Sequence, residues 1–308
     1  MKVFVTGATG ALGQATVPRL VTAGHEVRGV ARGDEKASWL RAHGAEPVEL
    51  DLFDAHAVGD AVHGSDAVAH LATNVPPLKK FGLPSAWKMH NRLRAEATPL
   101  LVNVAVSTGA QMFVKESVCF FYVDAGDALI DESAAMVSGK LVEPTLIGER
   151  AVERVTDNGG RGVVLRFGFF YGPSARGLDE SLKLARVGSS TIAGKRDGYV
   201  PSIHLDDAAD AVVAALERAP AGVYNVCDEP VTKGEYLRAF ADAFELRRTP
   251  RPIPSAALRI SAGSPTYLAG SQRTSNARFK AATGWEPMYR SVIEGWPAVA
   301  QVRRNQGA

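Results

Sequence analysis

The chain has 308 residues, of which 46% are hydrophobic and 22% are charged, and its formal net charge at pH 7 is +2. This length is long for one domain, short for two full ones, and sufficient to bury a sizeable core. The small net charge gives no reason to expect nucleic acid or an anionic membrane as a partner, and no apolar run approaches a membrane span. We expect a small-molecule substrate and leave a homodimer open.

The two cysteines, Cys119 and Cys227, are too few for a disulfide framework. Neither stands at metal-ligand spacing from another cysteine or a histidine, so no metal site is expected. The first residues already form a predicted strand, and no signal peptide is expected. The sequence therefore predicts a cytoplasmic protein with reduced thiols.

Strand and helix patterns alternate through the first half of the chain. The predicted strands are Lys2–Thr6, Glu26–Ala31, Pro47–Leu50, Ala67–Leu71, Met112–Lys115 and Gly162–Phe167. The predicted helices are Ala11–Ala23, Glu35–His43, Ala55–Val62, Arg94–Thr108 and Leu146–Asp157. Such alternation with short connections is typical of a parallel, doubly wound α/β sheet. Gly24 and Gly44 stand where a glycine commonly ends a helix.

A glycine-rich stretch joins the first predicted strand to the first predicted helix. Gly7 permits a tight turn, Gly10 lets a pyrophosphate approach the backbone, and Gly13 lets the helix pack closely on the strand. The helix N-terminus adds unbonded N–H groups and the positive end of the helix dipole. Because strand and helix flank the glycines in the required order, this stretch predicts a dinucleotide site.

The alternation ends after Gly172-Pro173. Later predicted elements are the helices Leu178–Val187, His204–Arg218, Lys233–Phe244 and Ser275–Thr283, the last closed by Gly284, and the strand Gly222–Cys227. The remaining stretches are Ser190–Val200, a loop or hairpin, Pro250–Ile260, irregular with three prolines, and Val302–Ala308, a frayed polar tail. We expect a dinucleotide-binding Rossmann domain over 1–172, with 202–227 contributing, and a smaller C-terminal substrate-binding α/β region over 173–201 and 228–308.

The residues after the second predicted strand indicate which dinucleotide binds. NAD-selective folds usually place an acidic residue there for the ribose 2′-OH. Here Ala31 occupies that region and Arg32 follows, and a guanidinium suits a 2′-phosphate. Asp34 and Glu35 come slightly later, and Arg32 could instead be a solvated loop charge. We expect NADP as the cofactor, with NAD as the alternative.

Five motifs in order resemble the short-chain dehydrogenase/reductase superfamily, in its extended or atypical epimerase/dehydratase-like branch. They are Thr6–Gly13, Asp51-Leu52, His70–Thr73, Leu165–Pro173 and His204–Ala209, and together they span nearly the whole chain. The resemblance implies a Rossmann fold and a nicotinamide cofactor. With the glycine loop and Arg32, it indicates as cofactor contacts Gly7, Ala8, Thr9, Gly10, Ala11, Leu12, Arg32, Asp51, Leu52, Leu71, Ala72, Thr73, Gly168 and Phe170.

The catalytic part of the family pattern is missing. The family's chemistry normally rests on Tyr-x-x-x-Lys, in which the Tyr is the acid or base and the Lys lowers the Tyr pKa. None of the seven tyrosines is followed four residues later by a lysine. Counting back from Glu153, the motif falls on Thr145 and Glu149. In the family pattern a Ser or Thr usually stands four residues before a Tyr. Counted from Tyr122, this position is occupied by Val118, and Ser117 stands one residue earlier.

Ser117, Tyr122 and Glu149 are the candidates for the missing catalytic group. Ser117 could hydrogen-bond a substrate carbonyl or satisfy the backbone at a strand end. Tyr122 could replace the phenol or be structural. Glu149 could act if burial raised its pKa, although an exposed helical charge near Arg150 and Arg154 is the favoured interpretation.

For the other polar residues we expect structural roles. Arg94 aligns with an Asn of the family pattern. We expect Glu116 to be a paired carboxylate, His70 a satisfied core histidine, and His204 a residue that starts a helix.

Aromatic residues follow the fifth and sixth predicted strands and could form an apolar wall beside the nicotinamide. They are Phe120, Phe121, Phe169, Phe170 and Tyr171, of which Phe169 is expected in the core. No Arg/Lys cluster for a nucleotide diphosphate appears in Gly172–Pro201, which weakens a sugar-nucleotide substrate.

Three functions are compatible with these residues. The first is an NADP-dependent oxidoreductase that acts on a small, partly apolar carbonyl or hydroxyl compound with a non-standard proton donor. The second is a non-redox epimerase, dehydratase, isomerase or cyclase that retains NADP. The third is a cofactor-binding regulatory protein without turnover. We favour the first because the cofactor loop is complete.

Overall fold

Seven parallel strands form the main sheet, in the order β12-β7-β5-β4-β1-β2-β3. The computed structural model describes residues 1–260 and 266–307. In chain order the strands are β1 (Lys2–Thr6), β2 (Glu26–Val30), β3 (Glu46–Val48), β4 (Ala67–His70), β5 (Met112–Val118), β7 (Arg161–Phe167) and β12 (Gly222–Val226). The winding reverses between β1 and β4, so the expected doubly wound α/β fold is confirmed.

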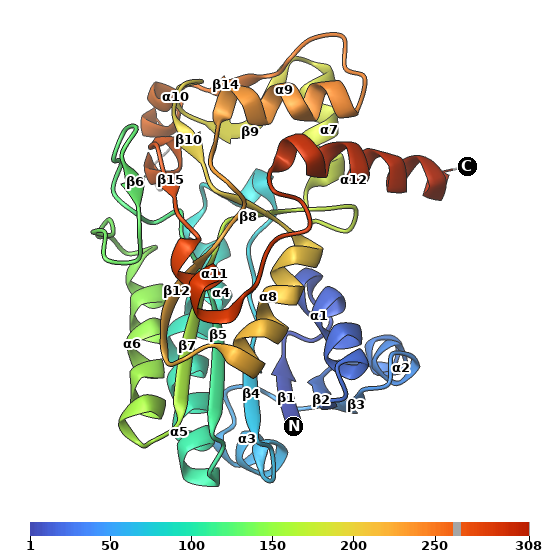
Figure 1. Cartoon of the computed structure of the whole chain (residues 1–308), viewed down its shortest axis with the longest axis vertical. Helices are drawn as coiled ribbons and strands as arrows, with labels where there is room; N and C mark the ends of the chain where they lie inside the picture. The colour runs from blue at the N-terminus through green and yellow to red at the C-terminus, as the bar shows by residue number, and fades with distance from the viewer. Residues whose placement is uncertain (261–265, 308) are drawn as a thin grey trace.

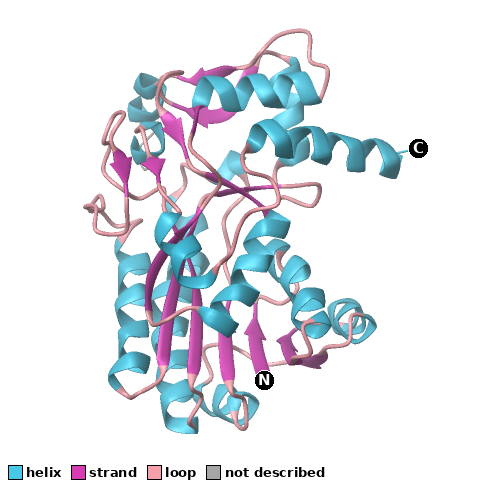
Figure 2. Ribbon diagram, viewed as in Figure 1, coloured by secondary structure: helices cyan, strands magenta, loops and turns pink. Residues whose placement is uncertain are grey.

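Helices cover both faces of this sheet (Figures 1 and 2). One face carries α1 (Ala11–Thr22), α2 (Asp34–Ala42), α8 (Leu205–Arg218) and α11 (Ala277–Thr283). The other carries α3 (Ala55–Val62), α5 (Thr98–Thr108) and α6 (Glu143–Asp157). The short turns η1 (Leu78–Lys80) and η2 (Pro84–Trp87), the helix α4 (Lys88–Arg92) and the π-helical turn η3 (Leu93–Ala97) lead into α5.

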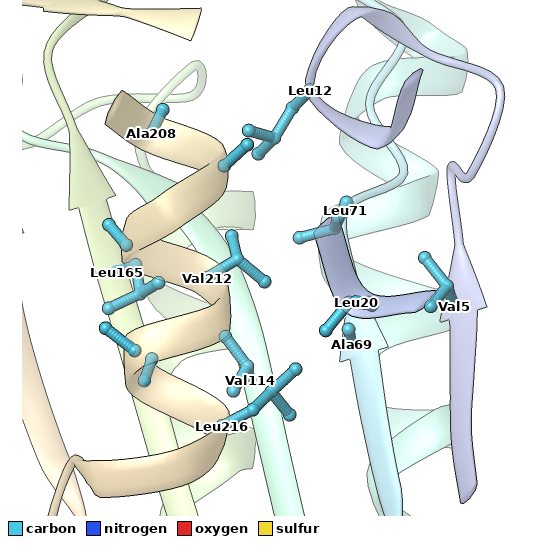
Figure 3. Packing of buried hydrophobic residues seen from close by; sticks show 14 of the residues in the cluster. Val5, Leu12, Leu20, Ala69, Leu71, Val114, Leu165, Ala208, Val212 and Leu216 are labelled. Carbon is cyan, nitrogen blue, oxygen red and sulfur yellow. The ribbon is translucent and has the colours of Figure 1, made fainter. Parts of the chain in front are cut away.

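The core between α1, α8 and the sheet fixes the N-terminus of α1 (Figure 3). Leu20 of α1, Val212 and Leu216 of α8, and Leu165 of β7 are each fully buried there. Burying one such side chain stabilises the folded state by about 1.5–3 kcal/mol. The loop that precedes α1 is therefore held on a rigid base.

A smaller set of elements lies beyond the carboxyl ends of the main strands (Figure 1). Its strand pairs are β6 (Leu129–Ile130) with β15 (Arg273–Thr274), β8 (Phe169–Tyr171) with β11 (Ser202–His204), β9 (Ser189–Ala193) with β14 (Arg251–Ile253), and β10 (Tyr199–Val200) with β13 (Val231–Thr232). Its helices are α7 (Leu178–Arg186), α9 (Lys233–Ala243), α10 (Ser255–Ile260), the turn η4 (Thr266–Ala269) and α12 (Val292–Gly307).

Several predicted helix ends are confirmed by the backbone. Gly24, Gly44 and Gly284 follow helices with φ of +82°, +76° and +66°, the left-handed region that glycine tolerates. His204 starts α8, because its ring nitrogen accepts a hydrogen bond from the amide of Asp206 at 3.2 Å. No helix in the described ranges could cross a membrane.

Two predictions in the C-terminal half are wrong, and a third is wrong in part. Residues 194–198 form the expected loop, but 190–200 do not form a hairpin, because β9 and β10 pair with β14 and β13, which lie far along the chain. Residues 250–260 are not irregular: they form β14 and α10, and Pro252 is tolerated because β14 has only one neighbouring strand. The tail over 302–307 continues α12, whose Trp296 packs on Phe240 of α9.

Candidate functional site

The glycine loop between β1 and α1 leaves almost no space for side chains. Gly7 has φ of +71°, and a Cβ there would lie 2.6 Å from the backbone nitrogen of Ala72. A Cβ on Gly13 would lie 2.1 Å from the carbonyl oxygen of Gly7. Gly10 differs, because its φ is −79° and its Cβ would meet only the Gly7 oxygen, at 3.2 Å. The expected tight turn and close helix packing are confirmed, and Gly10 is the position that faces open space.

The N-terminus of α1 is available to an anion. Among the described residues, no side chain caps the helix, and no acidic residue lies in its first turn. The backbone amides of Ala11, Leu12 and Gly13 have no intrahelical acceptor at this end. Together with the helix dipole, they form a ready site for a phosphate.

The other predicted cofactor contacts lie after the ends of different strands of the same parallel sheet. Arg32 is exposed between β2 and α2, Asp51-Leu52 follows β3, and Leu71–Thr73 follows β4. Gly168 and Phe170 follow β7, and a Cβ on Gly168 would lie 2.8 Å from the backbone of Ser202. Because parallel strands end at one edge, the structure brings these residues to the edge where such sheets bind ligands. Their contacts with a cofactor stay a prediction.

The three catalytic candidates meet in one buried network around Arg166, which we call the Arg166 network. Arg166 of β7 donates through Nη2 to the Glu149 carboxylate at 2.6 Å and through Nη1 to the Tyr122 hydroxyl at 2.8 Å. Tyr122 donates in turn to Oδ1 of Asn225 at 2.8 Å, and the Ser117 hydroxyl donates to Glu149. All five residues are less than one-tenth exposed.

This network changes the expected roles of its members. The favoured interpretation of Glu149 as an exposed charge is wrong, because helix α6 turns its carboxylate inward onto Arg166. Burial raises the pKa of Glu149, but the hydrogen bonds and charge of Arg166, with the Ser117 bond, hold it below its usual value. Burial raises the pKa of Tyr122 well above its usual value. These shifts favour an ionised Glu149 carboxylate and a neutral Tyr122 phenol near pH 7.

A second buried group surrounds Arg94, and we call it the Arg94 cluster. Arg94 donates to Nε2 of His90 at 3.0 Å and to the Glu116 carboxylate at 2.9 Å. Lys115 is fully buried and donates to the backbone oxygen of Glu116 at 2.7 Å. His70 shares a 2.6 Å hydrogen bond with Thr6. Glu116 as a paired carboxylate and His70 as a satisfied core histidine are confirmed.

Burial and neighbouring cations lower the pKa values of the three bases in this cluster. Burial first, and then the charge of Lys115, lower the pKa of His70 to about 3. Burial, followed by the charges of Arg94 and Lys115, lowers the pKa of His90 to about 2. Burial and the charge of Arg94 lower the pKa of Lys115 to about 7, although Glu116 and Glu149 oppose this. The surroundings of the cluster therefore disfavour the charged forms of all three bases.

Lys115 should make stability depend on pH in the alkaline range. Its folded pKa of about 7 lies below its usual 10.5, so the unfolded state binds more protons between these values. Stability should therefore rise as pH rises from about 7 toward 10. Lys115→Met should flatten this slope in melting temperatures measured across the range, while the exposed Lys36→Met should leave it unchanged. Identical slopes for Lys115→Met and the wild type would contradict the assignment.

Aromatic rings gather where the chain leaves β5, which we call the exit of β5. The sequence predicted some of them but not all. Phe120 stacks on Phe169 with ring centroids 4.2 Å apart and planes 6° apart. Phe121 meets the edge of Tyr267 at 4.9 Å. Phe169 is half-buried in this stack rather than in the core, whereas Tyr171 is fully buried and packs on Trp296 of α12.

Tyr267 was not predicted from the sequence as a site residue. It lies in η4, 146 residues after Phe121, and no local motif marks it. Only the packing of the C-terminal elements on the β5 exit brings it to the aromatic wall. No group of metal-binding residues occurs in the described part of the chain.

The family model of the NAD dependent epimerase/dehydratase family matches residues 3–227. The chain belongs to this family. The matched span covers the glycine loop, all seven strands of the main sheet and the Arg166 network.

Relatives include proteins named as reductases. A Streptomyces protein named 3-diazoavenalumate denitrifying reductase is 31% identical over 310 residues, covering 96% of this chain and 99% of the relative. A 2-alkyl-3-oxoalkanoate reductase of Shewanella oneidensis is 30% identical over 256 residues, covering 76% of this chain and 64% of the relative. The crystal structure of a human epimerase family protein with NADPH has the same fold, with a TM-score of 0.80, 24% identity and coverage of 98% and 99%.

Proposed function

We propose that the protein is an NADPH-dependent reductase that delivers a hydride to a small, planar, partly apolar substrate. The observation that carries the proposal is that a complete glycine loop is combined with an Arg166 network in which the Tyr122 hydroxyl and the Glu149 carboxylate are already hydrogen-bonded. Bound NADPH would supply the hydride. The cradle fits such a group, because Gly7 and Gly13 exclude side chains and the α1 amides face a phosphate.

In this proposal Ser117, Tyr122 and Glu149 position the site rather than transfer protons. The Tyr122 hydroxyl is fully buried and already bonded to Asn225 and Arg166. Glu149 stays ionised beside Arg166. Val118 replaces the usual hydroxyl residue of β5, and Ser117 points to α6 instead. A substrate that accepts a hydride without simultaneous protonation suits these residues best.

An aryl diazonium is such a substrate, and the Streptomyces relative is named for a diazo compound and a denitrifying reduction. The overall reaction, ArN2+ + NADPH → ArH + N2 + NADP+, balances without a protein acid. A carbonyl compound is the alternative, as in the name of the Shewanella relative, and it needs a proton from water or another group.

The proposal is tested by mixing the protein and NADPH with benzenediazonium or benzaldehyde and measuring NADPH consumption. Deuterium from C4-labelled NADPH should appear in the reduced product. A cofactor that stays unconsumed while the substrate changes would favour the non-redox function. Binding of NADPH with no turnover of any probe would favour the regulatory function.

Arg32→Ala should weaken NADPH binding about tenfold and leave NADH binding unchanged. The exposed guanidinium follows β2, where a ribose 2′-phosphate would lie, and one charge-assisted hydrogen bond is worth about 1.5 kcal/mol. Dissociation constants can be measured by fluorescence titration, with the exposed Arg41→Ala on α2 as the matched control. Equal losses of NADPH and NADH affinity would assign Arg32 no role in selectivity.

A further inference from the structure

Residues 74–87 lie between β4 and α4 and are held mainly by bonds of their own. Their backbone turn bonds run from Lys80 to Pro77, from Leu83 to Lys80 and from Ala86 to Leu83, at 2.8, 3.0 and 3.0 Å. Across the described ranges, each of these turn bonds stays inside the segment. A segment without ladder bonds to a neighbouring element can change its position at low cost.

One tryptophan closes this segment into a compact loop. Trp87 is 8% exposed, and its indole Nε1 donates to the backbone oxygen of Phe81 at 2.8 Å. The rings of these two residues meet edge to face, with centroids 4.8 Å apart. The indole also meets the His90 ring of α4 edge to face, at 5.3 Å. Trp87 therefore joins the middle of the segment to the helix that follows it.

From His90 the contacts continue to the main sheet. Arg94, in the π-helical turn η3, donates to Nε2 of His90 at 3.0 Å and to the Glu116 carboxylate at 2.9 Å. Glu116 belongs to β5, the neighbour of β4 in the main sheet. We call Trp87, His90, Arg94 and Glu116 the Trp87 relay. Both ends of the segment are therefore fixed at the edge where parallel sheets bind ligands.

Two donors of the Trp87 relay have no acceptor. Because Nε2 of the neutral His90 ring accepts from Arg94, the ring proton lies on Nδ1. His90 Nδ1 and Arg94 Nη1 are both buried and have no partner among the residues that the structure describes. Buried donors without acceptors are costly. A second arrangement of the segment that supplies an acceptor would therefore be favoured.

Apolar and cationic side chains of the segment face solvent. Val75 and Leu83 are 43% and 52% exposed, and Lys79 and Lys80 between them are exposed as well. The segment directly follows Leu71–Thr73, which are expected to contact the cofactor. If it moved over a bound dinucleotide, the apolar side chains would lose contact with water and the lysines would approach the phosphates. Both changes favour closure.

We propose that residues 74–87 are a lid that closes over bound NADPH, with Trp87 as the positioning residue that makes the lid move as one unit. Through the Trp87 relay, the lid stays rooted on β5 while it moves. Closure excludes water from the carboxyl edge of the sheet, where the proposed hydride transfer takes place. The lid rests on the proposed NADPH binding but does not require turnover.

Hydrogen–deuterium exchange measured by mass spectrometry tests closure directly. In a peptide that covers residues 79–86, which lies beyond Leu71–Thr73, saturating NADPH should slow exchange by about tenfold or more. The turn of residues 194–198, between β9 and β10, is the reference and should exchange at the same rate with and without NADPH. Unchanged exchange in residues 79–86 of NADPH-bound protein would overturn the proposal.

Trp87→Phe keeps a ring against Phe81 but removes the Nε1 donor. NADPH should then slow exchange in residues 79–86 by less than about threefold, because one lost hydrogen bond shifts an equilibrium by roughly fivefold. Trp39→Phe is the matched control, since Trp39 also packs on a histidine, His43, but at the end of α2. It should keep the wild-type response.

A merely structural Trp87 gives a different result. Its replacement would speed exchange in residues 79–86 equally with and without NADPH, and the slowing by NADPH would stay as in the wild type. Either that result or wild-type exchange in Trp87→Phe would overturn the positioning role.

The glycine loop distinguishes failure of the lid from failure of the proposed function. Slower exchange in both residues 7–13 and 79–86, without NADPH consumption by any probe, would support the lid and overturn the reductase function. NADPH consumption with slower exchange in residues 7–13 alone would do the reverse. Unchanged exchange in both peptides would show that NADPH does not bind and would overturn both proposals.

Discussion

Glu149→Ala should destabilise the protein by about 3–5 kcal/mol, because it leaves Arg166 buried without its carboxylate. Arg166 donates to Glu149 through both Nε and Nη2, and their side chains are 10% and 6% exposed. The substitution also removes the acceptor of the buried Ser117 hydroxyl. Urea unfolding followed by circular dichroism measures the loss in the free energy of unfolding. In a thermal scan, the same loss should lower the melting temperature by on the order of 10 °C.

Two further variants show whether the cause is the unpaired charge. Glu143→Ala removes a carboxylate from the same helix, but its pair with Arg150 is 57% exposed on both sides, so the cost should stay below about 1 kcal/mol. Glu149→Leu/Arg166→Met removes both buried charges and should recover much of the stability. A double variant as unstable as Glu149→Ala would show that lost packing, not the unpaired guanidinium, dominates.

The Arg166 network would not accept a lysine at position 149. A lysine there would bring a second positive charge against Arg166 and would remove the carboxylate that pairs with this guanidinium. Thr145, on which the resemblance predicts the family's tyrosine position to fall, is fully buried, and its hydroxyl has no partner among the residues described. Both positions are therefore buried, and the Glu149 carboxylate is committed to Arg166.

The main sheet could be predicted because its signals are local. Strand and helix patterns, the glycines of the first loop and Gly284 each act within a few residues, and the structure contains all of these elements. Residues 250–260 and α12 were missed because their order comes from distant partners: β14 pairs with β9, and Trp296 packs on Phe240. Prolines within both segments hid the pattern further.

The buried side of the site could not be predicted for a similar reason. The sequence marks Glu149 as unusual, but its partner Arg166 lies on the next strand, and Asn225 lies a further 59 positions along the chain. Tyr267 has no motif at all. Charge pairing of this kind depends on which side chains the sheet brings together, and a helical pattern shows only that one face of α6 is buried.

Gly10→Val should abolish NADPH binding and leave the fold intact. The backbone of Gly10 has φ of −79° and ψ of 175°, an extended conformation that valine readily adopts, and only the Gly7 oxygen lies near the new Cβ. Its branched methyl groups would instead extend over the N-terminus of α1, where the pyrophosphate would lie. Loss of affinity should exceed a hundredfold in a fluorescence titration, with a melting temperature close to that of the wild type.

Gly13→Val provides the opposite case within the same loop. A Cβ there would lie 2.1 Å from the Gly7 oxygen and 2.6 Å from the Ala8 backbone, neither of which can move without displacing α1 from β1. This variant should fail to fold or should melt far below the wild type, whereas Gly10→Ala should fold and bind NADPH with intermediate affinity. Normal NADPH binding by Gly10→Val would show that the phosphates do not cross this loop. Loss of folding in Gly10→Val would show that the open space at Gly10 is needed by the chain itself.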